Sequence, residues 1–202
     1  MQIINQSWAW VQKPRFPLET IEAAGRTCYK SEDAITHETA PVFVEKILSR
    51  GHESVIEHVS ASVRFITNRG VTHELVRHRL AAYSQESTRY VRYDGDMEFI
   101  RPVWEDGPGV EHLWMTSMLN AETTYQKLLL MGWPPQQARE VLPNSLKTEI
   151  VMTANLREWR HVFRLRAAKA AHPQMRALMI DCLAGFKKEI PVIFDDILPE
   201  EE

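Results

Sequence analysis

The sequence predicts an α+β fold: a single domain spanning residues 1–202, with a small mixed or antiparallel sheet and several helices, one of them long. Hydrophobic residues make up 44% of the 202 positions and charged residues 25%, the balance of a chain that folds rather than one that stays disordered. Stretches with apolar residues at every second position alternate with stretches in which they recur every three to four positions. No repeat, low-complexity tract or Gly/Ser linker divides the chain.

The N-terminal half places one clear strand among helices. Residues 59–65 alternate apolar and polar side chains, which is the pattern of a half-buried strand. A helix that starts at Thr39 ends at Gly51, a residue type that tolerates a left-handed C-terminal cap. The elements expected here are a helix over 17–30, the helix from Thr39 to Gly51, the strand, a short helix over 71–80, a polar loop and an extended piece near 89–101.

The C-terminal half is mostly helical. Along residues 110–131, apolar and small residues recur at spacings of four and three, a seam suited to packing on another helix or subunit. Asn155 is expected to cap a later helix, with Glu158 three residues on. The last helix turns Cys182 toward the core. The elements expected are the helix over 110–131, a short helix between Pro134 and Pro143, a strand over 146–154, the capped helix to about Lys169 and a helix after Pro173.

Charge and cysteine content narrow the function classes. The formal charge is −3, which disfavours a general coat for nucleic acid and a membrane-surface binder. No stretch approaches the roughly 18 apolar residues of a bilayer span, and the N-terminus lacks the pattern of a signal peptide. Cys28 and Cys182 form no CxxC pair, so we expect a reducing cytoplasm.

Arginines are concentrated in two stretches. Six arginines and no lysine lie between Arg64 and Arg92, and a planar guanidinium offers paired donors that match phosphate or carboxylate oxygens. Four more lie on the helix that Asn155 caps, whose N-terminal N–H groups suit a phosphate. Angular spacing turns the polar groups of that helix in more than one direction, so the helix is suited to present them to two ligands. We expect anionic ligands.

The residue patterns disfavour several other chemistries. HELVRH at 73–78 resembles the HExxH zinc sequence, but His73 and His78 are five residues apart and diverge by about 140° on a helix. We therefore expect no metal, and a metallohydrolase, which chelators would inactivate, is an unfavoured alternative. Phosphate-binding glycine loops and a GxSxG nucleophile turn are absent from the sequence.

Four ordered blocks carry a resemblance to a known family. They are RGHES at 50–54, RHRLAAYSQESTRY beginning at Arg77, AREVLP ending at Pro143, and TANLREWRHVFRLR at 153–166. In the second block, Arg77-His78-Arg79 is followed by seven residues and then Ser87. The chain resembles the flavin-dependent thymidylate synthases in these blocks, and the resemblance extends over most of residues 20–180.

The resemblance implies the fold of that family, a homotetramer with active sites at subunit interfaces, and a methyltransferase reaction. FAD takes electrons from NADPH, and the methylene group of 5,10-methylenetetrahydrofolate is transferred to dUMP, giving dTMP and tetrahydrofolate. The residues implied to bind FAD are Arg77, His78, Arg79, Asn155, Arg157, His161 and His52. Those implied to bind dUMP are Glu74, Gln85, Ser87, Arg89, Arg139 and Arg166.

Three residues are candidates for the chemistry itself. Arg166 is expected to stabilise negative charge on the uracil carbonyl oxygens, because a fixed guanidinium in a dry site acts far more strongly than in water. His52 is expected beside the flavin ring, where it shapes access for folate or nicotinamide. Ser87 is expected to bind substrate and not to attack it, because no adjacent general base is evident.

A non-enzymatic nucleotide or RNA binder remains the alternative. It would use the same arginines, with Tyr83, Tyr90 and Tyr93 as stacking platforms for bases. Such a protein would be colourless and would bind oligonucleotides with a steep dependence on salt.

Overall fold

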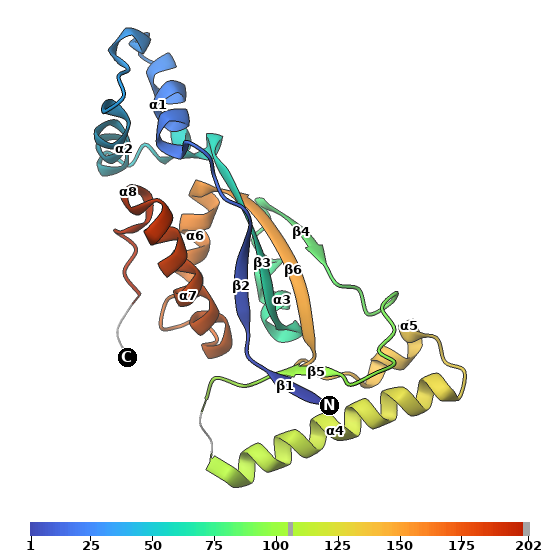
Figure 1. The fold of residues 1–202 in the computed structure, drawn as a ribbon. Coiled ribbons are helices and arrows are strands. Elements are labelled where there is room, and N and C mark those ends of the chain that lie inside the picture. The colour runs from blue at the N-terminus through green and yellow to red at the C-terminus, as the bar shows by residue number, and fades with distance from the viewer. Residues whose placement is uncertain (105–106, 200–202) are drawn as a thin grey trace. The chain divides into compact units, whose positions relative to one another are not determined.

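A computed structural model describes residues 1–104 and 107–199. The helices are α1 (Pro17–Thr27), α2 (Thr39–Ser49), α3 (Arg69–Leu75), α4 (Gly107–Leu130), α5 (Pro135–Ala138), α6 (Leu156–Arg166), α7 (Pro173–Glu189) and α8 (Pro191–Phe194), with 3-10 turns η1 (Glu32–Ala34), η2 (Glu53–His58) and η3 (Arg139–Val141) (Figure 1). The strands are β1 (Gln2–Ile4), β2 (Ser7–Gln12), β3 (Ser60–Asn68), β4 (Ala81–Gln85), β5 (Glu98–Ile100) and β6 (Lys147–Asn155). The predicted α+β class is confirmed.

The chain forms two compact units. Unit 1 comprises residues 1–8, 64–77 and 83–151, and unit 2 comprises residues 9–63, 78–82 and 152–202. In unit 1, β1 and β5 pair in parallel, with Gln2 opposite Glu98. The other strands form a four-stranded sheet in the order β2-β3-β6-β4, and each of these strands has residues in both units.

Most predicted elements are present, and four expectations differ from the structure in detail. The helix predicted over 71–80 is α3, which begins at Arg69 and ends at Leu75, so it stops before the Arg77-His78-Arg79 segment. Within the segment expected to be a loop lies β4, and the extended piece near 89–101 contains only the three-residue β5. The helix that Asn155 caps ends at Arg166 instead of Lys169.

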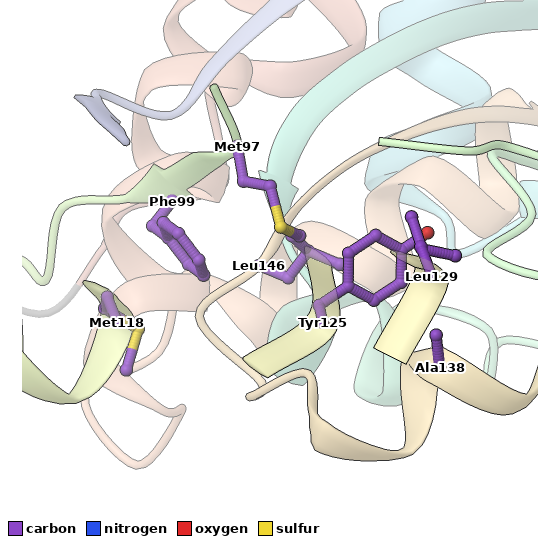
Figure 2. Close-up of a cluster of buried hydrophobic side chains, with 7 residues drawn as sticks. All are labelled: Met97, Phe99, Met118, Tyr125, Leu129, Ala138 and Leu146. Carbon is purple, nitrogen blue, oxygen red and sulfur yellow. The ribbon is translucent and has the colours of Figure 1, made fainter. Parts of the chain in front are cut away.

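The core of unit 1 forms where α4 packs on the β1–β5 ribbon and the segment before β6. The spacing predicted a seam through Ser117, Ala121, Thr124 and Leu128. In the structure it is displaced by one position, because the buried side chains of α4 are Met118, Glu122, Tyr125 and Leu129. Met118, Tyr125 and Leu129 belong to a cluster with four other buried residues, which are Met97, Phe99, Ala138 and Leu146 (Figure 2). The outer face of α4 leaves other apolar residues in solvent.

The core of unit 2 is aromatic. In α6, Trp159 and Phe163 are buried at a spacing of one turn and face Phe186 of α7, with ring centroids 4.9 and 5.0 Å from Phe186. Phe194 of α8 lies 5.0 Å from the same ring. Cys182 is fully buried on the inner face of α7, as predicted. This packing fixes α6, which carries several predicted site residues.

Among the described residues, no helix is both long and apolar enough to cross a bilayer.

Candidate functional site

The Arg77-His78-Arg79 segment lies in the turn between α3 and β4. The turn begins where the Arg77 N–H donates to the Glu74 carbonyl oxygen at 3.2 Å. Arg77 and Arg79 are exposed, whereas His78 is buried. The alternation arises because the segment has left the helix, so consecutive side chains point in different directions. Two cations are thereby presented to solvent beside a buried imidazole.

His78 is held between a carboxylate and a guanidinium within unit 2. Arg166 Nε donates to His78 Nε2 at 3.0 Å, and His78 Nδ1 lies 3.5 Å from Glu158 Oε1. Because arginine is always protonated, Nε2 must be the bare nitrogen and Nδ1 carries the proton. Burial, together with the charges of Arg166 and His161, lowers the pKa of His78 to about 4. The imidazole is therefore neutral at pH 7.

Glu158 and His161 complete this group, which we name the α6 polar cluster: His78, Glu158, His161 and Arg166. The edge of the His161 ring approaches His78, with centroids 5.6 Å apart. Burial raises the pKa of the Glu158 carboxyl, and His161 opposes that shift. The ligand atoms of His78, Glu158 and His161 lie within 4.8 Å of one another. A cation at His78 Nδ1 would force the proton onto Nε2 and break the Arg166 hydrogen bond, so the geometry favours a hydrogen-bonded relay.

Asn155 caps α6, as predicted. Its Oδ1 accepts from the Glu158 N–H at 2.8 Å, and the Leu156 N–H donates to the Val59 carbonyl oxygen at 2.9 Å. Two of the first N–H groups of the helix are thus satisfied inside the protein. Arg157, half exposed, donates to Glu57 at 2.5 Å, and this contact raises the pKa of the guanidinium.

Two other α6 arginines belong to a structural ion-pair network. Arg160 is buried and bridges Glu53 at 3.2 Å and Asp196 at 2.6 Å, and it also donates to the Ile193 carbonyl oxygen. Arg164, on the exposed side, contacts the same two carboxylates at 3.3 and 3.4 Å. These arginines hold α6 to η2 and to the C-terminal segment.

In unit 1, Gln85 is fixed by two threonines. Its Nε2 donates to Thr72 Oγ1 at 2.9 Å and to Thr148 Oγ1 at 3.3 Å, which joins β4 to α3 and β6. These two hydrogen bonds fix the orientation of the Gln85 amide oxygen. Glu74, two residues after Thr72 in α3, is half-buried.

The segment after Gln85 brings three of the predicted substrate residues together. Arg139 Nη1 donates to Thr88 Oγ1 at 3.3 Å, so the arginine from η3 reaches the 87–89 segment. Ser87 Oγ accepts from the Arg89 N–H at 3.3 Å, the local turn of a short polar side chain. The Ser87 hydroxyl, the Arg89 backbone and the Arg139 guanidinium therefore occupy one small region of unit 1.

A network that sequence reasoning missed supports this segment. Tyr93 Oη donates to Glu86 Oε1 at 2.6 Å, and Lys147 lies 3.4 Å from Glu86 and 2.9 Å from Glu149. Burial and the Glu86 carboxylate raise the pKa of the Tyr93 hydroxyl, which stays protonated. Glu86 stands between Gln85 and Ser87, so fixing it fixes both neighbours.

The arginines of residues 64–92 differ in their pairing. Arg64 lies 3.6 Å from Glu149, and Arg92 lies 2.5 Å from Asp94. Within residues 1–104 and 107–199, the other four form no ion pair: Arg69, Arg77, Arg79 and Arg89. Unpaired guanidinium groups in such number favour an anionic ligand.

Comparison with known proteins agrees with this chemistry. Residues 11–192 match the family model described as thymidylate synthase complementing protein. The chain belongs to this family. Proteins named flavin-dependent thymidylate synthase from Corynebacterium efficiens and Geobacter sulfurreducens are 35% and 36% identical to it over 96% and 95% of this chain, which is 85% and 86% of theirs. The protein of the same name from Mycobacterium tuberculosis is 36% identical over 87% of this chain and 78% of its own.

A solved structure supports the fold. The UMP/dUMP methylase PolB from Streptomyces cacaoi, bound with 5-Br dUMP, matches with a TM-score of 0.81 over 96% of both chains, at 22% identity. At that identity the likeness shows that the two chains share a fold and no more.

The family blocks and the observed contacts coincide only in part. Unit 2 joins His78, His161 and Arg166, and unit 1 joins Ser87, Arg89 and Arg139. Arg157 is engaged by Glu57, and His52 is an exposed residue before η2. Sequence reasoning placed Glu158 only in a capping box. The signal for Glu158 in the sequence was a carboxylate one turn before His161. That signal is weak, because the sequence does not show that His78 lies opposite Glu158.

Proposed function

We propose that this chain is a flavin-dependent thymidylate synthase, which methylates dUMP to dTMP using 5,10-methylenetetrahydrofolate and NADPH. The structural observation that carries the proposal is the pairing of its arginines. Of the four unpaired arginines in residues 64–92, three are those that the resemblance assigns to FAD or dUMP: Arg77, Arg79 and Arg89. The relatives named flavin-dependent thymidylate synthase support the same reaction.

The donors of the Arg77-His78-Arg79 segment suit FAD. Arg77 and Arg79 are exposed guanidinium groups matched to diphosphate oxygens, and the neutral His78 between them adds no charge. When bound, the flavin supplies the hydride for reduction. His161, Asn155 and Arg157 would contribute from α6, with Arg157 exchanging its Glu57 partner for the ligand, and His52 would border the ring. This donor set supports FAD as the cofactor.

The unit 1 residues suit a pyrimidine nucleotide. Arg89, Arg139 and the Ser87 hydroxyl provide donors for phosphate or carbonyl oxygens, and Gln85 offers both a donor and an acceptor. The two threonine contacts of Gln85 hold its amide, which suits recognition of a base edge. Glu74 would complete the nucleotide site.

Arg166 would act on the reacting base. Negative charge accumulates on the uracil carbonyl oxygens as C5 is activated, and a fixed guanidinium stabilises it. His78 Nε2 accepts the hydrogen bond from the Arg166 Nε–H, and Glu158 lies 3.5 Å from the other ring nitrogen of His78. These two contacts limit rotation of the guanidinium. His78 and Glu158 are positioning residues in this scheme.

The assembly and setting are part of the proposal. The outer face of α4 exposes Leu113 and Leu119, a surface that subunit contact would bury, which supports a homotetramer with shared active sites. The family match extends through segments of both units, which supports one catalytic domain over residues 1–202. Both cysteines are free thiols, which supports a cytoplasmic enzyme. The formal charge of −3 disfavours a nucleic-acid polymer or a membrane surface as a partner.

A visible spectrum of the purified protein before and after addition of dUMP tests the cofactor and the substrate together. We expect flavin absorbance that dUMP perturbs, and dTMP formation that requires both the folate and NADPH. A colourless protein that binds oligonucleotides with steep salt dependence would overturn the proposal in favour of the RNA-binding alternative.

A further inference from the structure

A cavity of about 570 Å³ lies along α1 and α2 in unit 2. Helices α1 and α2 lie side by side, and the segment that leads to η2 closes one part of the cavity (Figure 1). Apart from His52, none of its lining residues belongs to the proposed flavin or nucleotide site. The residues that matter here are Arg26, Tyr29, Phe43, Lys46, Arg50 and His52.

A buried carboxylate fixes the first cation of this cavity. Glu22 is only 1% exposed, and its Oε1 accepts from Arg26 Nε at 3.1 Å and Nη2 at 2.8 Å. Its other oxygen accepts from the Thr39 hydroxyl at 2.9 Å. Burying a carboxylate is unfavourable unless it is paired and hydrogen-bonded, so all three groups are held together. Arg26 is thus a pre-oriented guanidinium in the cavity wall.

An aromatic ring backs this guanidinium. The Arg26 guanidinium carbon lies 4.8 Å from the centroid of Phe43. Phe43 reaches this position because residue 25 is glycine: a Cβ there would lie 2.6 Å from the ring. The close approach of α1 and α2 therefore creates a planar apolar surface with a fixed cation on it. Tyr29, 69% exposed, adds a second aromatic ring to the lining.

Two more cations line the cavity from α2. Lys46 and Arg50 are four residues apart, so they lie on one face of the helix, and both are exposed. Neither forms an ion pair with any described part of the chain. Like charges at this spacing repel each other, by a few tenths of a kcal/mol in isolated helices. Glu22 compensates the charge of Arg26, so the lining sets one carboxylate, Glu38, against the two unpaired cations Lys46 and Arg50, and the cavity favours an anion.

We propose that this α1–α2 cavity binds the anionic end of a co-substrate whose reactive ring is placed at His52. The inference rests on the proposed function, in which His52 borders the flavin. Two co-substrates have the required chemistry, an aromatic body that carries anionic groups. They are the folate, through its glutamyl carboxylates, and the nicotinamide dinucleotide, through its phosphates. The cations select the charged end, and the rings of Tyr29 and Phe43 accept the planar part.

Steady-state kinetics of the double variant Lys46→Gln/Arg50→Gln test the proposal. Both residues are exposed, so we expect normal folding, an unchanged flavin spectrum and an unchanged KM for dUMP. The KM of one co-substrate should rise about tenfold, as expected for two solvent-exposed charge contacts, with little change in kcat. The control is Lys169→Gln/Lys188→Gln, which removes the same charge from exposed residues of unit 2 that do not line the cavity.

The choice of co-substrate separates the two sources. If phosphates occupy the cavity, the double variant loses discrimination between NADPH and NADH. If carboxylates do, it loses the advantage of a triglutamylated folate over a monoglutamylated one. Unchanged KM values for both co-substrates would overturn the proposal, as would equal changes in the control variant.

Direct binding distinguishes failure of this site from failure of the proposed function. The probes are 2′,5′-ADP and p-aminobenzoyl-triglutamate, titrated into the purified holoenzyme by calorimetry. If the wild type forms no dTMP but binds one probe, and the double variant does not bind it, the function fails and the anion site stands. If neither probe binds the wild type, the site is overturned whatever the activity.

Discussion

Arginines are concentrated both on α6 and in residues 64–92, but the two groups have different surroundings in the structure. Arg160 and Arg164 share Glu53 and Asp196, and Arg157 donates to Glu57. In the other stretch, Arg77 and Arg79 form no ion pair with any described residue. Arginine content alone therefore does not identify a ligand site. What separates the groups is the presence of a carboxylate within reach.

Arg166 differs from these three arginines, because its Nε–H donates to the His78 imidazole at 3.0 Å. His78 is neutral at pH 7, so this hydrogen bond orients the guanidinium and brings no counter-charge. A guanidinium arranged in this way is suited to a charge that appears only during reaction. The comparison thus divides α6 into a structural face and a functional end.

The largest expected effect is that of Arg166→Ala on turnover. We expect kcat to fall by about 10²–10³, as for loss of one pre-oriented donor to developing negative charge. Flavin should remain bound, because Arg166 is assigned to the pyrimidine. Single-turnover dTMP formation and the visible spectrum measure the two quantities on one sample. Normal turnover would place Arg166 with the structural arginines.

The next effect is that of Arg160→Met on stability. Arg160 is buried, and its removal leaves Glu53 and Asp196 without their closest cation, which should lower the free energy of unfolding by about 3 kcal/mol. Arg164→Gln is the matched control, since it contacts the same carboxylates from an exposed position and should cost less than about 1 kcal/mol. Urea unfolding measures both. Equal losses would mean that burial does not distinguish the two arginines.

A smaller effect, on flavin binding, compares an unpaired arginine with a paired one outside α6. Arg79→Gln should weaken flavin binding about 10–100-fold, because a charged donor to an anionic group is lost. Arg92→Gln removes the same charge from an arginine that is paired with Asp94, and flavin binding should be unchanged. Fluorescence titration of FAD into the deflavinated proteins gives both constants. Full flavin affinity in Arg79→Gln would remove this residue from the cofactor site.

The sequence predicted elements whose signals are local. The Asn155 cap, the strand at 60–68 and the apolar face of α7 were all found, because each depends on residues within a few positions of one another. The early end of α3 and the strand β4 were missed. Tyr83 of β4 donates its hydroxyl to the Leu75 carbonyl oxygen at 2.8 Å, a contact made after the chain has turned, and periodicity does not report it.

The site residues divide in the same way, into those with a local signal in the sequence and those whose partners are distant in the chain. The family blocks named His78, His161 and Arg166, but no spacing rule indicated that Glu158 would lie beside His78. The partners of Arg160 are 107 and 36 residues away in the chain, so its structural role was invisible in the sequence. Long-range pairing decided which arginines remained available for ligands.

The α6 polar cluster also predicts a pH dependence of stability. The pKa of His78 is about 4 in the folded protein and about 6.5 when unfolded, so the unfolded state binds more protons between these values. Stability is therefore fully present above pH 6.5 and is lost as the pH falls toward 4, by about 2 kcal/mol near pH 5. Glu158 opposes this loss, because its raised pKa makes the folded state bind that proton more readily than the unfolded state does.

His78→Gln isolates the imidazole contribution. Glutamine is neutral at every pH, so the variant should lose less stability than the wild type between pH 7 and pH 5, whatever its stability at pH 7. Urea midpoints at the two pH values, compared as a double difference, cancel the titration of groups common to both proteins. An identical pH dependence in the two proteins would mean that His78 protonates freely in the folded state. The Arg166 hydrogen bond to Nε2 would then not persist, since a protonated imidazole has no acceptor nitrogen.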